Sequence, residues 1–142
     1  MKKITIIGHL TAKIGRVILN NAAVKSLQSK RQNKESELLA RTEKWISAKG
    51  WQEDLSMSGV AAKLGTDTDN LSVLFRERFG IRFLEWRRKV RIEEAKRLLL
   101  EDKTIPTAVI GEAVGIPDRS NFRRQFKMVT GYTPAEWRRL KH

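Results

Sequence analysis

Apolar residues recur every three or four positions along most of this chain, which is the spacing of one face of an α-helix. The clearest stripe runs from Phe83 to Glu101 and predicts a long helix. Another stripe predicts a helix over residues 35–49, and the polar stretch Ser29–Lys34 before it is typical of a linker. Upstream, the apolar residues of the segment Leu10–Ile18 fall on one helical face. The pattern predicts an all-α protein.

Two stretches of the sequence resemble each other at a period of about fifty residues. In each, a short apolar helix ends at a glycine, Gly65 or Gly115, where the chain can become left-handed without a Cβ clash. A second helix with apolar residues four apart follows, and in the first copy the cluster Asp67–Asp69 offers side-chain oxygens to cap it. The small residues that let the paired helices approach are Ala61, Ala62 and Gly111. This arrangement is the helix-turn-helix design.

These patterns predict the domain organisation. Residues 1–34 form an N-terminal extension, either an amphipathic helix or a flexible arm, and residues 35–142 form the folded domain. The capping-box sequence Thr133–Glu136 predicts a last helix that carries Pro at its first position. The expected parts of the folded domain are a first helix-turn-helix at about 56–80, a linker helix at about 83–101, a second helix-turn-helix at about 106–131 and a C-terminal helix at about 134–141.

The net charge of +13 is distributed in bands along the 142 residues. Residues 1–34 contain eight Lys or Arg side chains and no acid, and residues 119–142 contain seven basic side chains and one acid, whereas residues 101–118 are acidic. Banded basic surfaces are typical of proteins that bind polyanions, because each neutralised phosphate releases counterions. A generally solubilising surface is the alternative.

The composition excludes several kinds of chemistry. There is no cysteine, and the two histidines, His9 and His142, lie at the ends of the chain, so disulfides, thiolate metal sites and histidine-based triads are not expected. No carboxylate pair and no phosphate-binding glycine loop stands out, so we expect no catalytic residue, no metal and no cofactor. The apolar runs of three or four residues are far shorter than the roughly 20 residues of a membrane span. We expect a cytoplasmic protein without membrane contacts.

From about Leu55 to Trp137 the chain resembles the DNA-binding domain of AraC/XylS-type transcription regulators of bacteria. The motifs that carry the resemblance are Leu64–Gly65 with Leu71–Ser72 and Leu74–Phe75, then Arg91–Leu99, then Glu112–Gly115 with Phe122, Arg124, Phe126–Lys127 and Gly131–Pro134. The resemblance implies two helix-turn-helix subdomains joined by a long helix, each presenting a recognition helix to successive major grooves of double-stranded DNA. It also implies action through recruitment or exclusion of RNA polymerase.

The resemblance places base-facing residues on the second recognition helix. They are Arg119, Ser120, Asn121, Arg123 and Arg124. Arginine can pair bidentately with guanine and asparagine with adenine, and Arg124 is the first candidate. The alternative for each arginine is a solvated side chain on a surface helix. Pro117 stands where the family usually has a capping hydroxyl residue.

The first recognition helix departs from the family pattern. Its base-facing positions are Asp69 and Val73, with Asn70 and Ser72 beside them, and the family often has a basic, aromatic or long polar side chain where Asp69 and Val73 stand. An Asp is repelled by phosphate but can accept a hydrogen bond from cytosine, and Val73 can contact a thymine methyl group. The equal alternative is that this helix contributes position and shape rather than base contacts.

Further cations are predicted to contact phosphates. They are Arg76, Arg78, Arg87, Lys127 and Arg138. For each of them a surface ion pair is an equal alternative. The aromatic residues at buried helical spacings are predicted to form the core rather than to stack on bases.

The sequence leaves two other functions open. One is a protein-interaction module that keeps the helical fold without base readout, which Asp67, Asp69 and Val73 motivate. The other is non-specific binding of DNA or RNA by the basic residues 1–34. For the extension itself three alternatives are open: a homodimerisation helix, a basic arm that lies on DNA, or a remnant of a longer parent protein.

Overall fold

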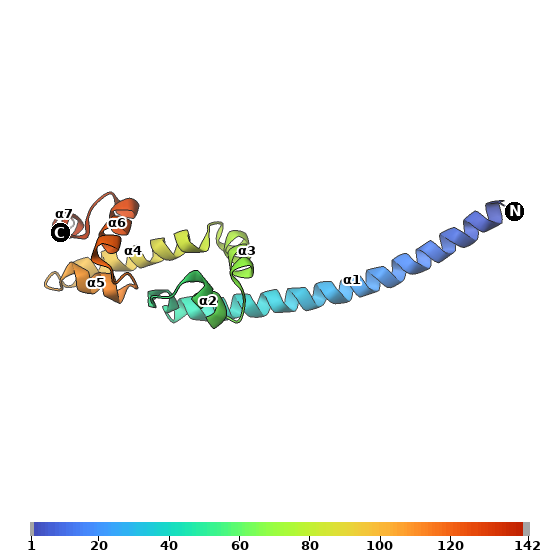
Figure 1. Cartoon of the computed structure of the whole chain (residues 1–142), viewed down its shortest axis with the longest axis horizontal. Coiled ribbons are helices and arrows are strands. Elements are labelled where there is room, and N and C mark those ends of the chain that lie inside the picture. The colour runs from blue at the N-terminus through green and yellow to red at the C-terminus, as the bar shows by residue number, and fades with distance from the viewer. Residues whose placement is uncertain (1, 141–142) are drawn as a thin grey trace. The chain divides into compact units, whose positions relative to one another are not determined.

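The structure is a computed structural model that describes the backbone of residues 2–140 and the side chains of residues 21–140. Every regular element in this range is helical, which confirms the predicted all-α class. The elements are α1 (Lys2–Ser47), the 3₁₀ helix η1 (Gly50–Gln52), α2 (Met57–Lys63), α3 (Thr68–Phe79), α4 (Phe83–Glu101), α5 (Thr107–Ala113), α6 (Arg119–Thr130) and α7 (Pro134–Leu140) (Figure 1). None of the described helices is long and apolar enough to cross a bilayer.

The chain divides into two compact units, residues 1–40 and residues 41–142. In the first unit, α1 exposes apolar side chains at Val24 (46%) and Leu27 (66%). The predicted linker at Ser29–Lys34 is wrong, because α1 is helical throughout this stretch. The stretch lacks Gly and Pro, its Lys, Arg and Gln residues favour helix, and Arg31 Nε donates to Glu35 Oε1 at 3.1 Å. The apolar face predicted at Leu10–Ile18 lies outside the described side chains.

The second unit contains the repeat as two helix pairs, α2 with α3 and α5 with α6. The glycines that end the first helix of each pair, Gly65 and Gly115, have φ of +74° and +92°. The glycines that end the second helices, Gly80 and Gly131, have φ of +73° and +84°. All four occupy the left-handed region, which costs a residue with a Cβ about 1–2 kcal/mol. The two pairs therefore share one turn geometry.

An aspartate caps the second helix of each pair. Asp67 Oδ1 accepts from the Asn70 amide at 2.8 Å, and Asp118 Oδ1 accepts from the Asn121 amide at 2.7 Å. The expectation that Pro117 takes the capping position of α6 is wrong. The helix begins one residue later, and Asp118 satisfies an amide that has no partner within the helix.

Each pair has its own apolar core against α4. The first is an aromatic cluster in which Phe75 packs against Phe79, Phe83 and Trp86 with ring centroids 4.7–5.0 Å apart. The second core contains Ile92, Ala95, Leu99, Ile110, Val114, Ile116, Phe122 and Phe126. Gly111 permits the close approach expected of it, since a Cβ there would lie 2.9 Å from the Phe122 ring. Ala62, expected at the same kind of contact, is exposed instead.

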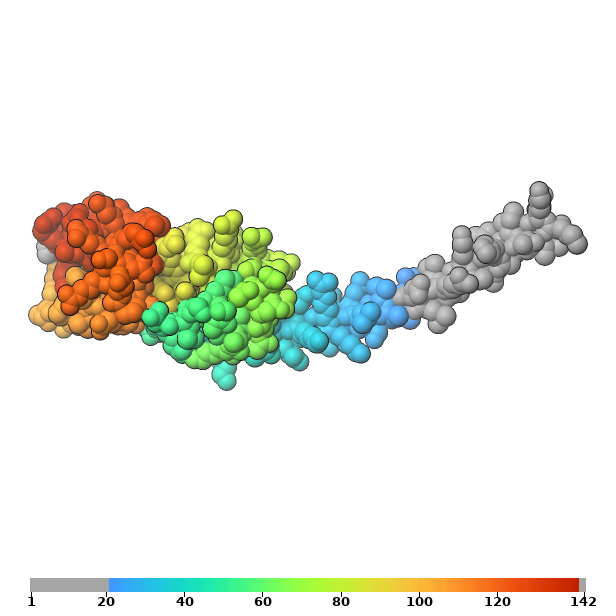
Figure 2. Space-filling model, viewed as in Figure 1, coloured from blue at the N-terminus to red at the C-terminus, as the bar shows by residue number. Residues whose placement is uncertain are grey.

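The helix α4 joins the two pairs into one body. It packs against η1, α3, α5, α6 and α7, and the space-filling view shows the green first pair and the orange-red second pair on either side of it (Figure 2). The buried Arg91 on α4 donates from Nε to Trp51 O and from Nη2 to Glu53 O, both at 2.7 Å. Burial is the main cause that lowers the pKa of Arg91 to about 10. The loop around η1 is thereby fixed to the middle of α4, the spacer helix between the two pairs.

Candidate nucleic-acid interface

The second helices of the two pairs, α3 and α6, are built alike. When the capping aspartates Asp67 and Asp118 are aligned, the closing glycines Gly80 and Gly131 align as well. Each helix buries two aromatic or aliphatic anchors four residues apart and leaves the opposite side in solvent. In Figure 1, α3 lies at the start of α4 and α6 towards its end. The two exposed sides are the candidate DNA-contacting surfaces.

The exposed side of α6 is strongly basic. Phe122 and Phe126 point into the core, so Ser120, Arg124 and Lys127 fall on the opposite side and are exposed. The helix carries four basic side chains and no acid. Within the described part of the chain, no ion pair neutralises any of these four cations. This surface fits a polyanion.

A side-chain network prepares Arg124 for contact. Its Nη2 donates to Asn121 Oδ1 at 2.8 Å, and Gln125 Nε2 donates to the same oxygen at 3.0 Å. Asn121, predicted to face bases, is partly buried, and its carbonyl oxygen is occupied by these two donors. Restricting the arginine before binding lowers the entropy cost of ordering it on a partner. Gln125 was not predicted as a site residue from the sequence, although its spacing of four residues from Asn121 is a detectable signal.

The structure separates Arg119 and Arg123 from the outward-facing residues. Both line a hollow of about 380 Å³ beside the first residues of α5 and α7, which supply Thr107 and Pro134 to its wall. One turn apart on one helix, these two guanidinium groups can address the same anion. The five predicted base-facing residues of α6 therefore divide between two sides of the helix.

The exposed side of α3 is much less basic. Asp69, Asn70 and Val73 are exposed, and Ser72 is partly buried. The Asn70 side chain donates from Nδ2 to Asp67 Oδ2 at 3.4 Å and so belongs to the helix cap. The charges of α3 cancel, with two acids and two arginines.

The cations predicted to contact phosphates fall into two groups. Arg76, Arg78 and Lys127 are exposed. Arg87 and Arg138 are partly buried and donate to backbone carbonyls within the fold. Arg87 Nη1 donates to Leu55 O at 2.5 Å, and burial lowers its pKa. Arg138 donates from Nε to Leu99 O at 3.0 Å, near the C-terminal end of α4, where helix carbonyls lack partners within the helix.

Nothing in the described residues indicates a metal site: no three His, Cys, Asp or Glu side chains gather there.

Known proteins share this arrangement. A family model described as "Helix-turn-helix domain" matches residues 60–140. The arabinose operon regulatory protein of Escherichia coli is 40% identical over 85 residues, 60% of this chain and 29% of that protein. The uncharacterized HTH-type transcriptional regulator YisR of Bacillus subtilis is 30% identical over 92 residues, 63% of this chain and 31% of that protein. The chain thus spans less than a third of the length of these curated relatives.

Solved structures of two regulator domains have a similar fold. The C-terminal domain of AraT, a response regulator from Geobacillus stearothermophilus, superimposes with a TM-score of 0.66 at 30% identity, covering 73% of this chain and 85% of that one. The C-terminal domain of the two-component response regulator yesN from Fusobacterium nucleatum gives a TM-score of 0.60 at 31% identity, covering 66% and 90%. The family model and the curated relatives describe a family of transcription regulators, which is not an enzyme family. The chain belongs to the AraC/XylS-type helix-turn-helix family and carries the DNA-binding domain of a transcription regulator.

Proposed function

We propose that α3 and α6 enter two neighbouring major grooves on one side of a duplex and that α6 reads most of the sequence. The observation that carries this proposal is the pair of identically capped recognition helices with exposed outward sides at the two ends of α4. The 19 residues of α4 span roughly 28 Å, comparable with the 34 Å that separates successive major grooves on one side of B-DNA.

In this proposal some side chains contact bases and others contact phosphates. Ser120 and Arg124 contact base edges from the outward side of α6, where Arg124 suits guanine. Arg119 and Arg123 hold a phosphate at the hollow beside α5 and α7. The exposed cations Arg76, Arg78 and Lys127 contact further phosphates, which fix the register of the protein on DNA but carry no sequence information. Arg87 and Arg138 act within the fold.

The test is a gel shift on genomic fragments with competitor DNA over a range of salt concentrations. The chain should prefer particular fragments and lose affinity steeply with salt. Arg124→Ala should cost about 1–3 kcal/mol at the preferred site and little on random DNA. Arg97→Ala is the matched control, because Arg97 lies on α4 in ion pairs with Glu94 and Glu101. Equal effects of the two substitutions would contradict the assignment, and absence of DNA binding would favour the interaction module.

The regulator would act in the bacterial cytoplasm by binding alone, with RNA polymerase as its partner and no chemistry of its own. Transcription in vitro from a promoter that contains the selected site tests this. Transcript levels should change with the intact chain and not with Arg124→Ala. Unchanged transcription at saturating occupancy of the site would contradict the role of polymerase.

For residues 1–34 we propose homodimerisation. The apolar residues Leu10, Ile14, Val17 and Val24 follow the alternating spacing of a coiled-coil seam, with Asn21 at the intervening seam position. Because the segment carries eight cations and no acid, salt should strengthen pairing, whereas salt would weaken a basic arm on DNA. Light scattering should give a dimer mass at high salt and a monomer mass for Val24→Asp. A monomer at all salt concentrations would exclude the dimer.

A further inference from the structure

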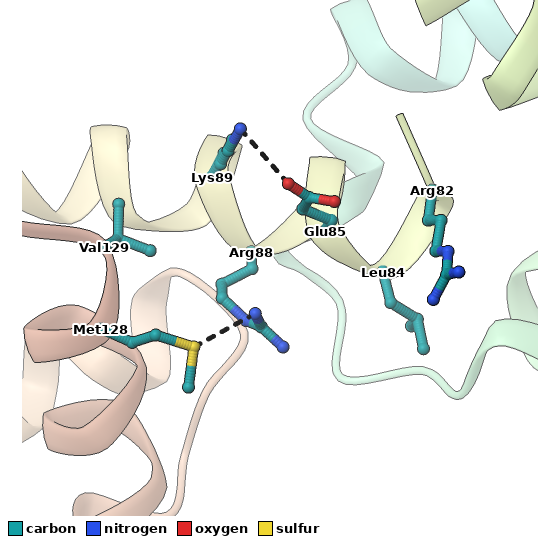
Figure 3. A pocket seen from close by; sticks show the side chains of 7 residues that line it. All are labelled: Arg82, Leu84, Glu85, Arg88, Lys89, Met128 and Val129. Atoms are coloured by element: carbon teal, nitrogen blue, oxygen red, sulfur yellow. Dashed lines mark hydrogen bonds and ion pairs between the residues drawn. The ribbon is translucent and has the colours of Figure 1, made fainter. Parts of the chain in front are cut away.

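A basic groove lies on the spacer helix between the two recognition helices. It has a volume of about 500 Å³ and is bounded by the first turns of α4 and the C-terminal end of α6 (Figure 3). Arg82, Arg88 and Lys89 contribute three cations, against the single carboxylate of Glu85. None of these three cations was predicted as a DNA contact from the sequence, although their neighbour Arg87 was.

The cations of this groove have weak partners. Arg88 Nη1 lies 3.3 Å from Met128 Sδ, and a thioether sulfur is a poor hydrogen-bond acceptor for a guanidinium group that has five donors. Lys89 Nζ lies 3.5 Å from Glu85 Oε1, and both side chains are about half exposed, so this pair contributes little to stability. Figure 3 shows Arg88 reaching from α4 towards Met128 on α6. The donors of Arg88 are thus available to a stronger acceptor.

The groove adjoins the C-terminal end of α6 and the start of α4, where the chain leaves α3. Met128 lies one turn after Arg124 on α6, and Arg82 comes directly after Gly80 and Ile81, which close α3. A duplex that extends from α3 to α6 would carry its backbone past this part of α4. The wall also contains exposed apolar side chains, Leu84 (49%) and Met128 (60%), which suit the carbon atoms of deoxyribose beside a phosphate.

We propose that this groove binds the DNA backbone phosphates that lie between the two major grooves, with Arg88 and Lys89 as the main contacts. The proposal rests on the proposed function, since the ligand is the same duplex. Arg88 exchanges the sulfur of Met128 for a phosphate oxygen, and Lys89 turns from Glu85 towards the backbone. Charge-assisted bonds to phosphate are about twice as strong as neutral hydrogen bonds. The groove thus contributes affinity and alignment but no base readout.

The first test is the double variant Arg88→Gln/Lys89→Gln in the full chain. Binding should weaken on the order of tenfold at moderate salt, equally for preferred and random DNA. The salt dependence should become less steep by about 0.9 in log–log slope for each phosphate that the variant no longer neutralises. Arg97→Gln, on the same helix but paired with two glutamates, is the control and should leave affinity and slope nearly unchanged. Circular dichroism and the thermal midpoint would establish that the variants are folded.

The second test identifies the phosphates. Neutral methylphosphonates at the centre of the preferred site should weaken binding of the unmodified chain but not weaken binding of the double variant further. Additive losses would overturn the proposal, as would a double variant with the affinity and salt slope of the parent chain. In both of these cases the chain without substitutions still prefers its site, so only the proposal for the groove is contradicted and the proposed function is not. A parent chain that shows no preference for any fragment would instead contradict the proposed function itself.

Discussion

The two recognition helices share one backbone design and carry different chemistry. Both begin at an aspartate cap and end at a left-handed glycine. Their outward sides differ at two positions, since Ser120 corresponds to Asp69 and Arg124 to Val73, whereas Lys127 and its counterpart Arg76 are both basic. The four cations of α6 contrast with the balanced charges of α3. The duplicated scaffold therefore holds one helix suited to reading bases and one suited to fixing position.

The difference shows which constraints act on each part. Caps, turns and anchors must recur because they build the helix pair, and they do so in both copies. Outward side chains contribute little to folding, and their chemistry follows the ligand. We therefore expect the two halves of the domain to contribute unequally to DNA binding.

The largest expected effect concerns the turns. Gly115→Ala would place a Cβ 2.5 Å from Gln52 O at φ +92°, whereas at Gly65 the nearest atom to a Cβ is 3.8 Å away. Gly115→Ala should lower the free energy of unfolding by about 3 kcal/mol, from left-handed strain plus overpacking, and Gly65→Ala by only about 1 kcal/mol. Urea unfolding followed by circular dichroism measures both. Equal losses would show that the two turns are not packed differently.

An exchange of outward residues tests the comparison itself. Giving α6 the α3 residues, Ser120→Asp with Arg124→Val, should abolish the preference among fragments, and the preferred site should bind more weakly by about 1–3 kcal/mol. The reciprocal change, Asp69→Ser with Val73→Arg, should raise affinity for random DNA and steepen the salt dependence by about 0.9 for each additional phosphate that is neutralised. Gel shifts in a salt series measure both. If the reciprocal change had no effect, α3 would not lie against DNA.

The smallest effect is expected at the caps. Asp67→Ala and Asp118→Ala each remove the acceptor of a backbone amide at a helix start and should each cost about 1 kcal/mol in unfolding free energy. The further contact of Asp67 with Asn70 Nδ2, at 3.4 Å, is long and should add little. Thermal or urea unfolding would detect these losses. A substantial difference between the two would contradict the equivalence of the two helix starts.

Local patterns in the sequence were sufficient for the helical class, the repeat and the left-handed glycines. They did not reveal the contacts that distant residues make. Nothing near Arg87 or Arg138 in the chain shows that Leu55 O and Leu99 O will accept their hydrogen bonds. The stretch Ser29–Lys34 looked like a linker because it is polar, although most of its residues are good helix formers. Periodicity alone did not separate Arg123 from Arg124 on the surface of α6.

Hydroxyl-radical footprinting on the preferred fragment tests the central claim most directly. We expect two protected stretches on one side of the duplex, roughly 10.5 base pairs apart, with protection beneath α6 disappearing first in Arg124→Ala. A single protected stretch, or two stretches on opposite sides of the duplex, would contradict the entry of both helices into neighbouring major grooves.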